Sequence, residues 1–554
     1  MEMSHKKETA AQAIIHCLRQ AQVEKVFCVP GESYLPVLDA LYDTSSIQVI
    51  SARHEGGAAF MAEAYAKSAL KPGIVMATRG VGATNLSIGV HTAYQDSTPM
   101  VVFLGQVHSK FIGKEGFQEV DLAHYFQPIA KWSVELTDAD RTVEIVQRAF
   151  HIAISGRPGP VIISLPEDVL HQETIIASPQ TPLRQTPVPS ATEVKKMEAM
   201  LNHAKRPVII AGGGVKSAQA EVALKHVAEL FHLPVLSAFR RHDVFPNDHL
   251  LYAGHLGLGT PKSVLKTVQQ ADVVLAFGTR LSEVTTQDYS LLSTDQQLIH
   301  IDIDFNSIGK SYFPDVAIVA DMKEALLQLQ TMKLTPNWER WASACNARYI
   351  HASRIDETES THMNTEIISY LLTTLPDNAI ITNDAGNFAG WIHQYYTFTQ
   401  PHTYVGPTSG AMGYGLPAAI GAKLAFPNRV VVGFAGDGGF MMTCQELETA
   451  VRYNIPVICL VFNNKMYGTI RMHQEMHYPQ KVIATDLGEV CFKDLAISVG
   501  ALGYRVTTIQ EFKVAFAESY QAKKPTVIEI MSDREQISVS QTITDIRDRN
   551  NHKK

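Results

Sequence analysis

Short runs of β-branched and other apolar residues alternate with longer amphipathic stretches from one end of the chain to the other. These runs lie at 26–29, 74–77, 100–104, 161–164, 207–211, 273–277, 299–303, 379–382, 430–434, 456–462 and 526–530. Strands this apolar are buried on both faces, and the helical patterns between them indicate crossover connections. The pattern therefore predicts an α/β fold made of doubly wound parallel sheets.

Two changes in composition divide these runs into three groups. Residues 171–194 contain four prolines among serine and threonine, which is typical of an extended linker. Residues 331–361 are mixed and charged, and we expect them to include a connecting helix. Because 554 residues are too many for one core, we expect three parallel-sheet domains, at 1–175, 190–330 and 355–540.

Composition limits the kinds of partner that the chain can bind. A net charge of −7 gives no bulk positive field for nucleic acid or an anionic membrane. The polar start lacks an apolar signal core, and no run approaches the roughly 18 apolar residues of a membrane span. The six cysteines form no CxxC pair, which favours free thiols in a reducing compartment. We therefore expect a cytoplasmic protein that binds neither nucleic acid nor membranes.

The most informative motif is GDGG at 436–439, between the predicted strand at 430–434 and a helical pattern. Glycines at such a turn let backbone N–H groups approach a diphosphate at the positive end of a helix. Asp437 would supply a hard oxygen for Mg²⁺, and a side-chain amide oxygen from the Asn-Asn pair at the end of the next predicted strand would supply another. A Gly-Asp-Gly turn alone is a common tight turn, but its pairing with Asn-Asn at 463–464 is far more specific.

The stretch that begins at this turn, GDGGFMMTCQELETAVRYNIPVICLVFNN, resembles the thiamine diphosphate signature of the acetohydroxyacid synthase and pyruvate oxidase-like superfamily. The likeness covers most of the chain, because RHEGGAAFMAEAYAK, GRPGPVIISLPEDV and TSGAMGYGLPAAIGA also follow the acetohydroxyacid synthase pattern. The resemblance implies a pyrimidine-binding first domain, a Rossmann-like central domain and a diphosphate-binding last domain.

By this resemblance, Asp437, Asn464 and the backbone carbonyl of Met466 would hold Mg²⁺. Glycine turns and polar side chains from several loops would bind the rest of the cofactor's diphosphate. These residues are Gly386, Asn387, Gly436, Gly438, Gly439, Asn464, Gly468 and Thr469. The carbonyl of Gly410 would accept a hydrogen bond from the cofactor's aminopyrimidine, and Met412 would prop the cofactor in its folded form.

Glu55 corresponds to the catalytic glutamate of the family, which bonds to the aminopyrimidine and drives it to the reactive tautomer. Its small and apolar neighbours would desolvate the carboxyl group, although a glutamate at a helix N-terminus is also favoured by the helix dipole alone. Gln118 matches a family residue that faces the cofactor and the substrate. Because Glu55 and Asp437 lie in different domains, the site forms between domains. In the family these domains come from two subunits, so a homodimer at least is implied.

Several positions depart from the family pattern. His473 stands where acetohydroxyacid synthases place a tryptophan that selects the acceptor, and we hypothesise that His473 selects the acceptor here. Phe388 replaces a frequent histidine. The glycines at 212–214 follow a predicted strand, as in a flavin-binding middle domain, but Gly259 and Leu281 replace the family's histidine and phenylalanine. The sequence therefore leaves open whether FAD binds.

The resemblance implies an acetolactate-synthase-like carboligase, which decarboxylates pyruvate on thiamine diphosphate and joins the two-carbon unit to a second 2-ketoacid. An alternative is another carboligase or lyase with this cofactor, of benzaldehyde-lyase, acyl-CoA-lyase or sulfoacetaldehyde type. A non-catalytic cofactor-binding paralogue is disfavoured, because Glu55, Met412, Asp437 and Asn464 are all present. The sequence leaves open dimer or tetramer, a regulatory subunit, and branched-chain amino-acid synthesis or acetoin formation.

Overall fold

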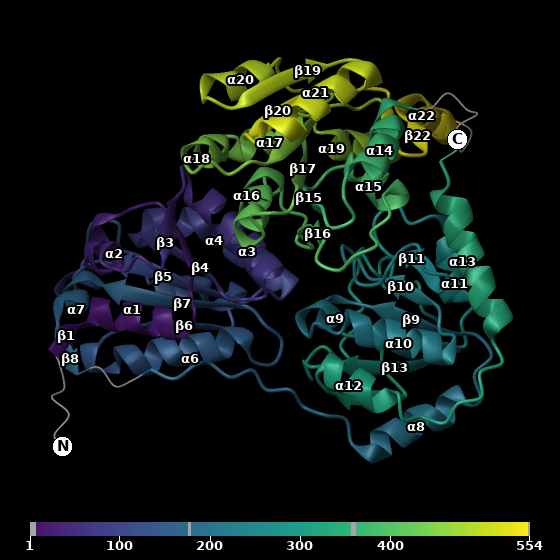
Figure 1. Cartoon of the computed structure of the whole chain (residues 1–554), viewed down its shortest axis with the longest axis horizontal. Coiled ribbons are helices and arrows are strands. Elements are labelled where there is room, and N and C mark those ends of the chain that lie inside the picture. Colours follow the sequence, from purple (N-terminus) through teal and green to yellow (C-terminus); the bar gives the residue numbers. More distant parts are fainter. Residues whose placement is uncertain (1–6, 176–178, 356–361, 552–554) are drawn as a thin grey trace.

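The computed structural model describes residues 7–175, 179–355 and 362–551. Within these residues the chain forms three six-stranded sheets, in which all neighbouring strands are parallel, and helices cover each sheet (Figure 1). The predicted α/β class with three parallel-sheet domains is therefore confirmed. Short antiparallel pairs lie near both ends of the described chain: β1 (Lys7–Thr9) with β8 (Glu173–Ile175), and β21 (Gln536–Ser538) with β22 (Gln541–Thr542). No helix in the described ranges is long and apolar enough to cross a membrane.

The first domain contains the sheet that carries the predicted catalytic glutamate. Its strands are β2 (Lys25–Cys28), β3 (Gln48–Ser51), β4 (Gly73–Thr78), β5 (Met100–Gln106), β6 (Trp132–Glu135) and β7 (Pro160–Pro166). Its helices are α1 (Ala10–Gln20), α2 (Leu35–Tyr42), α3 (Glu55–Ala69), α4 (Arg79–Asp96), α5 (Leu122–Phe126), α6 (Thr142–Ile154) and α7 (Glu167–His171). The sheet order is β3-β2-β4-β5-β7-β6.

The central domain has the strand order of a dinucleotide-binding fold, β11-β10-β9-β12-β13-β14. Its strands are β9 (Pro207–Ala211), β10 (Val235–Ser237), β11 (Tyr252–His255), β12 (Val273–Phe277), β13 (Gln297–Asp302) and β14 (Val316–Val319). Its helices are α8 (Ala191–Leu201), α9 (Gly213–Ser217), α10 (Glu221–Phe231), α11 (Lys262–Gln269), α12 (Met322–Leu329) and α13 (Glu339–Ser353). Helix α13 is the helix that the sequence predicts between 331 and 361.

The third domain carries the GDGG turn. Its strands are β15 (Ile380–Asn383), β16 (Tyr404–Val405), β17 (Val431–Gly436), β18 (Ile458–Asn463), β19 (Leu502–Val506) and β20 (Thr526–Met531). Its helices are α14 (Met363–Thr374), α15 (Ala389–Tyr395), α16 (Gly415–Ala425), α17 (Asp437–Thr443), α18 (Glu446–Arg452), α19 (Gly468–His477), α20 (Phe492–Ser498), α21 (Ile509–Ala522) and α22 (Ile543–Asn551). The sheet order is β16-β15-β17-β18-β20-β19. Numbered in chain order within each domain, the first and third sheets share one topology, 2-1-3-4-6-5.

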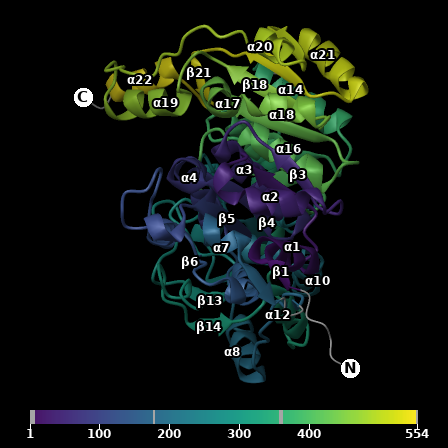
Figure 2. The ribbon, with the colours of Figure 1, turned by 90° about the vertical axis from the view of Figure 1, so that its left-hand side faces the viewer.

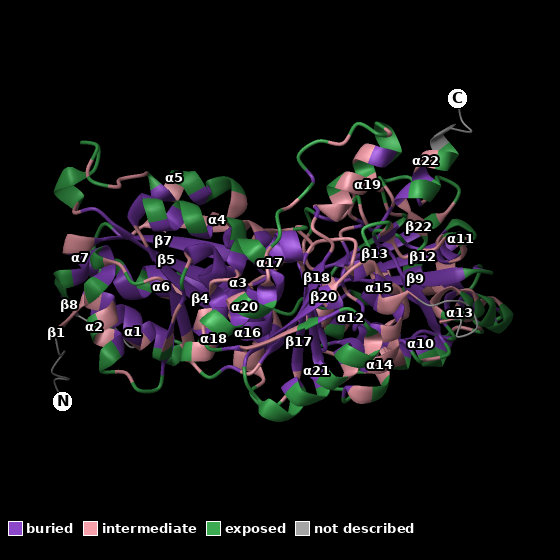
Figure 3. Ribbon diagram, turned by 90° about the horizontal axis from the view of Figure 1, so that it is seen from above, coloured by how far each residue is buried: buried purple, intermediate pink, exposed green. Residues whose placement is uncertain are grey.

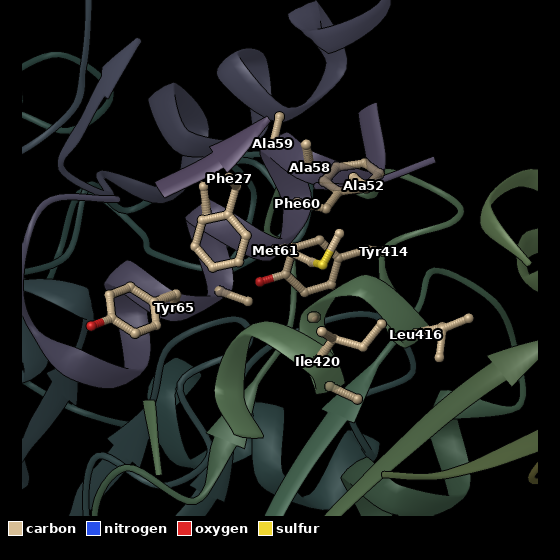
Figure 4. Packing of buried hydrophobic residues seen from close by; sticks show 14 of the residues in the cluster. Phe27, Ala52, Ala58, Ala59, Phe60, Met61, Tyr65, Tyr414, Leu416 and Ile420 are labelled. Atoms are coloured by element: carbon tan, nitrogen blue, oxygen red, sulfur yellow. The ribbon is translucent and has the colours of Figure 1, made fainter. Parts of the chain in front are cut away.

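The first and third domains share one hydrophobic core, although about 200 residues of central domain separate them in the sequence. Helix α3 packs on α16 between the two sheets (Figures 1 and 2). Phe60 and Met61 of α3 lie beside Tyr414, which directly precedes α16 (Figure 4). Seen from above, the buried strands form the middle of each domain (Figure 3). Glycine is required at 421, because a Cβ atom there would collide with the carbonyl of Met61.

Candidate active site

Glu55 is the first residue of α3, and its side chain is buried with 9% of its surface exposed. Asn85 of α4 donates a 2.9 Å hydrogen bond from Nδ2 to Glu55 Oε2. Residue 82 must stay small, because a Cβ atom on Gly82 would lie 3.2 Å from Glu55 Oε1. His54 caps the helix by accepting the N–H of Gly56 on Nδ1 at 3.0 Å. Glu55 is therefore buried at the start of α3, and one amide side chain orients its carboxyl group.

A second carboxyl group, Glu446 of α18, reaches the same helix start from the third domain. Its Oε1 accepts the backbone N–H of His54 at 3.0 Å, and its Oε2 accepts that of Arg53 at 3.2 Å. Thr449 donates from Oγ1 to Oε2 at 2.7 Å. A Cβ atom on Gly57 would lie 2.6 Å from Glu446 Cδ, so only glycine allows this approach. Burial raises the pKa of Glu446 to about 7.

Gln118 lies in the loop after β5, in the left-handed region with φ +65°. Its carbonyl accepts the backbone N–H of Gly80, at the start of α4, at 2.9 Å. Arg79 fixes the same loop by donating to the carbonyl of Phe117 at 3.4 Å. Since Glu55 contacts Gly82 in the first turn of α4, the structure brings Gln118 and Glu55 to the same end of that helix.

Met412 is half-buried in the segment that leads into α16, between Gly410 with φ +69° and Gly413 with φ +84°. Asp384 follows β15, and its Oδ2 accepts the N–H of Gly413 at 2.9 Å. A Cβ atom on Gly439 would lie 2.6 Å from the same oxygen, so the GDGG turn packs directly on this carboxyl group. Burial raises the pKa of Asp384 to about 6. Asp384 thus joins the Met412 segment to the predicted diphosphate turn.

The three predicted Mg²⁺ ligands lie together at the carboxyl ends of β17 and β18. Asp437 Oδ2 accepts the N–H of Lys465 at 2.6 Å, and Asn464 Oδ1 accepts the N–H of Met466 at 3.2 Å. Burial raises the pKa of Asp437, although four backbone N–H groups oppose this effect. Among the described residues, no cluster of three or more His, Cys, Asp or Glu side chains could hold a metal. A single carboxylate with amide and carbonyl oxygens fits Mg²⁺ only where diphosphate oxygens and water complete the shell.

The predicted diphosphate residues also meet at this edge. Thr469 Oγ1 donates to Asn387 Oδ1 at 2.9 Å, which joins the end of β15 to the start of α19. The ring of Phe388 covers the two predicted glycines beside it: a Cβ atom would lie 2.5 Å from this ring on Gly386 and 3.2 Å on Gly436. That ring stacks on Phe462, with centroids 5.6 Å apart. Phe388, which stands where the family often has a histidine, therefore forms an apolar wall of the turn.

The last described residues close over this edge. Asn387 Nδ2 donates to the carbonyl of Ile537 at 2.8 Å, and Ile537 packs near Gly468. Helix α22 is joined to α19 by Arg547, whose Nη2 and Nε lie 2.6 Å and 2.9 Å from the two oxygens of Glu475. Hydrogen bonding to Arg547 lowers the pKa of Glu475 to about 2. His473, on the same helix α19, is exposed and stacks with His477.

Sequence reasoning missed Asn85, Asp384 and Glu446. Asp384 carried a usable signal, because a carboxyl group directly after a buried strand and two residues before a glycine lies at the ligand-binding edge of a parallel sheet. Asn85 and Glu446 carried no such signal. Each acts on a segment that is distant in the sequence, and only the packing of helices reveals the contact.

Comparison with protein family models matches each of the three domains to a known domain. Residues 8–125 match the N-terminal thiamine pyrophosphate-binding domain of thiamine pyrophosphate enzymes, residues 194–329 match the central domain, and residues 384–530 match the C-terminal thiamine pyrophosphate-binding domain. The chain is a thiamine pyrophosphate enzyme. The family predicted from the sequence motifs and its cofactor, thiamine diphosphate, are thereby confirmed.

Curated relatives of this thiamine pyrophosphate enzyme align along nearly its whole length. It is 34% identical to the probable acetolactate synthase large subunit of Methanocaldococcus jannaschii, covering 94% of this chain and 92% of the relative. It is also 34% identical to the acetolactate synthase isozyme 1 large subunit of Escherichia coli, covering 96% and 95%. For the acetolactate synthase large subunit of Corynebacterium glutamicum the identity is 33%, covering 94% and 86%. The enzyme is therefore of the acetolactate synthase type.

Proposed function

We propose that this enzyme decarboxylates pyruvate and joins the resulting two-carbon unit to a second 2-ketoacid, forming an acetolactate-type product. The observation that carries the proposal is the set of contacts that gathers Asp437, the 464–466 loop and the 410–413 segment at one sheet edge, in a chain of acetolactate synthase type. Thiamine diphosphate, when bound, supplies the nucleophilic carbon and the electron sink for decarboxylation. The protein holds, folds and ionises this cofactor and keeps water away from it.

Glu55 is proposed to exchange a proton with the aminopyrimidine ring. Its burial at the start of α3 and the hydrogen bond from Asn85 hold the carboxyl group in one place, which suits a group that must meet the cofactor in a fixed geometry. Gln118, at the same end of α4, is proposed to face the substrate. Met412 is proposed to prop the folded cofactor, and the carbonyl of Gly410 to accept the aminopyrimidine N–H.

The residues at the carboxyl edge of the third sheet fit a diphosphate with Mg²⁺. Asp437, Asn464 and the Met466 carbonyl would hold the metal. Backbone groups of the GDGG turn, at the start of α17, suit diphosphate oxygens, because helix N-termini favour anions. Gly386, Asn387, Gly468 and Thr469 would line the opposite side, where Asn387 and Thr469 already bond to each other.

We propose that two copies of the chain associate and that each active site takes Glu55 from one subunit and the diphosphate site from its partner. Four apolar side chains next to these segments are roughly half-exposed: Val81 and Ile88 on α4, and Met441 and Met442 on α17. A second copy would cover them, because large exposed apolar patches mark association sites.

The six cysteines are free thiols, which supports the cytoplasmic location predicted from the sequence.

The glycine-rich turn of the central domain does not fit a flavin diphosphate. The N–H groups of Gly212 and Gly214 already donate to the carbonyls of Phe277 and Gly278, at 2.9 Å and 2.8 Å. A Cβ atom on Gly213 would lie 2.9 Å from Nε of Arg241, and this guanidinium is already paired with Asp96 at 3.0 Å. We therefore propose a redox-neutral reaction without FAD bound at this turn. Flavin absorbance in the solution that is left after the purified protein has been denatured and removed would contradict this proposal.

A second candidate function keeps the cofactor and changes the substrate to another acyloin, acyl-CoA or sulfoacetaldehyde-type compound. Glu32, which replaces a glycine of the family pattern, lies 3.3 Å from Arg79, and Arg79 also pairs with Glu167 at 3.0 Å. This ionic group adjoins the loop that carries Gln118, so it changes the charge near the proposed substrate side.

Product analysis separates the two candidates. Purified protein is incubated with thiamine diphosphate, Mg²⁺ and pyruvate, in parallel with a Glu55→Gln variant. Accumulation of acetolactate that the variant lacks supports the synthase proposal. If the wild-type protein binds the cofactor and leaves pyruvate unchanged, the synthase proposal is wrong, and a screen of acyloins and acyl-CoA compounds tests the second candidate.

A further inference from the structure

The first and third domains are topological copies, and they hold each other's helix starts in the same way. In each sheet, one helix follows the second strand: α3 after β3, and α16 after β16. The helices that follow the third strand are α4 after β4, and α17 with α18 after β17. Each copy therefore presents an equivalent pair of helices to the shared core, with the predicted catalytic residues at the starts of α3 and α16.

The segment that precedes each of these helices is held by a buried carboxyl group from the other domain. Glu446, on α18 of the third domain, accepts the backbone N–H groups of Arg53 and His54 just before Glu55. Asp96, the last residue of α4 in the first domain, accepts the backbone N–H of Thr408 at 2.9 Å, four residues before Met412. The same construction occurs twice, once before each predicted catalytic segment.

The contact with Glu446 is not needed to complete helix α3 itself. The first turn of α3 is already capped by His54 Nδ1, so Glu446 bonds to donors that precede the helix. Holding Glu446 there requires glycine at 57, a hydrogen bond from Thr449, and burial of a carboxyl group, which is costly. A costly arrangement that fixes a catalytic segment is expected where the geometry of that segment matters.

We propose that Glu446 is a positioning residue for Glu55: it fixes the backbone at 53–54 from across the domain interface and thereby sets where the Glu55 carboxyl group lies. This inference rests on the proposed role of Glu55. A small displacement of a positioned group lowers a rate much more than it lowers binding. Loss of the contact is therefore expected to slow cofactor activation while the third domain still binds the diphosphate.

The test uses three variants of the full-length protein. Glu446→Gln keeps one acceptor oxygen but places an amide NH₂ against a backbone donor. Thr449→Val removes only the hydroxyl that steadies the carboxyl group. Glu518→Gln is the matched control, because it makes the same chemical change at an exposed position of the third domain, on α21.

The first readout is amide hydrogen exchange in protein without cofactor. Exchange at residues 53 and 54 is expected to be faster in the Gln and Val variants and unchanged in the control. The second readout is exchange of the C2 proton of bound thiamine diphosphate, expected to slow by about tenfold to a hundredfold in Glu446→Gln, with the cofactor Kd unchanged. A matching fall in kcat with an unaltered KM for pyruvate is expected.

Wild-type amide protection and wild-type C2-proton exchange in both variants would overturn the inference. If the Glu446→Gln variant does not fold, as shown by the absence of a thermal unfolding transition, the two readouts of Thr449→Val decide instead. If the wild-type enzyme itself fails to exchange the C2 proton, the proposed function fails instead. The amide exchange at 53 and 54 still decides whether Glu446 holds that backbone.

Discussion

The hydroxyl of Tyr414 donates a 2.6 Å hydrogen bond to Glu63 Oε2, which joins the start of α16 to the middle of α3. Both side chains are fully buried. Lys67 Nζ lies 2.8 Å from Glu63 and 3.1 Å from Asp96. Burial raises the pKa of Glu63, whereas Lys67 and Arg241 overcome the effect of burial at Asp96 and hold its pKa below the usual range. This polar network ties the helix of Glu55 to the segment of Met412.

Replacing Tyr414 by phenylalanine is expected to lower the free energy of unfolding by about 1–3 kcal/mol, because a buried acceptor on Glu63 loses its donor. Urea unfolding followed by circular dichroism measures the change. Tyr42→Phe is the control, because its side chain is almost fully exposed. If Tyr414→Phe and Tyr42→Phe have the same free energy of unfolding, the polar network tolerates the loss of the Tyr414 hydroxyl group.

The Glu55→Gln variant is expected to lose activity by about 10²-fold to 10⁴-fold, the usual contribution of a proton-transferring side chain. Its affinity for thiamine diphosphate is expected to stay the same, because the proposed diphosphate and Mg²⁺ ligands all lie in the third domain. Steady-state kinetics and calorimetric titration check the two statements. Glu24→Gln, at an exposed position of the first domain, is the control. Retained activity in the Glu55 variant would remove it from the mechanism.

Removing Mg²⁺ with a chelator is expected to release thiamine diphosphate, and adding the metal back is expected to restore binding. The Asp437→Asn variant should need more Mg²⁺, by more than the roughly tenfold that loss of a supporting partner costs a metal site. Fluorescence titration of cofactor binding against Mg²⁺ concentration measures this. Cofactor binding that is indifferent to the chelator would contradict the proposed metal site.

The pH dependence of stability is expected to report on Glu446. Burial raises its pKa from 4.5 to about 7, while Thr449, the N–H groups of residues 53 and 54, and Arg452 oppose the rise. The folded protein therefore holds this proton more tightly than the unfolded chain does. The stabilisation is complete below pH 4.5 and is lost as the pH rises through about 7, a change of roughly 3 kcal/mol at about 1.4 kcal/mol per pH unit.

The Glu446→Gln variant carries no such titration. The free energy of unfolding of the wild type, minus that of this variant, is therefore expected to fall as the pH rises across that window. Urea unfolding at several pH values measures the difference. A difference that is constant with pH would mean that Glu446 is ionised in the folded protein throughout.

His473→Trp is expected to shift the acceptor preference toward longer 2-ketoacids, because a large apolar ring replaces a polar one on exposed α19. Competition between pyruvate and 2-ketobutyrate as acceptors, read from the product ratio, measures the shift. The neighbouring exposed His477→Trp is the control. An unchanged ratio in the His473 variant would assign this histidine to the solvent-facing surface only.

The sequence predicted the middle of every sheet and none of its edges. All eleven predicted runs became strands, and each is an interior strand of its sheet. The edge strands were not predicted because they are less apolar or very short. Strand β14 alternates buried and exposed residues, and β16 has only two residues. Strand β10 is interior but has three residues, too few to show a pattern.

The residues proposed for the cofactor site could be selected from the sequence because they lie in short motifs at strand ends, such as GDGG at 436–439. The carboxyl groups that hold distant backbone segments, Glu446 and Asp96, could not be selected in this way. Glu446 acts on residues nearly 400 positions away, and Asp96 acts on Thr408. A local pattern reports the period and the ends of an element, but it carries no information about which distant backbone donor a carboxyl group will accept.

The core that the first and third domains share has a consequence for biosynthesis. Helix α3 packs on α4 and on the strands of its own domain, but its face toward the third domain is covered only when α16 is made, 346 residues after α3 ends. At about 5–20 residues per second, the ribosome needs roughly 20 to 70 s to make that stretch. During this interval the nascent first domain presents one uncovered apolar helix face, and we expect this face to attract chaperones and to promote aggregation of truncated chains.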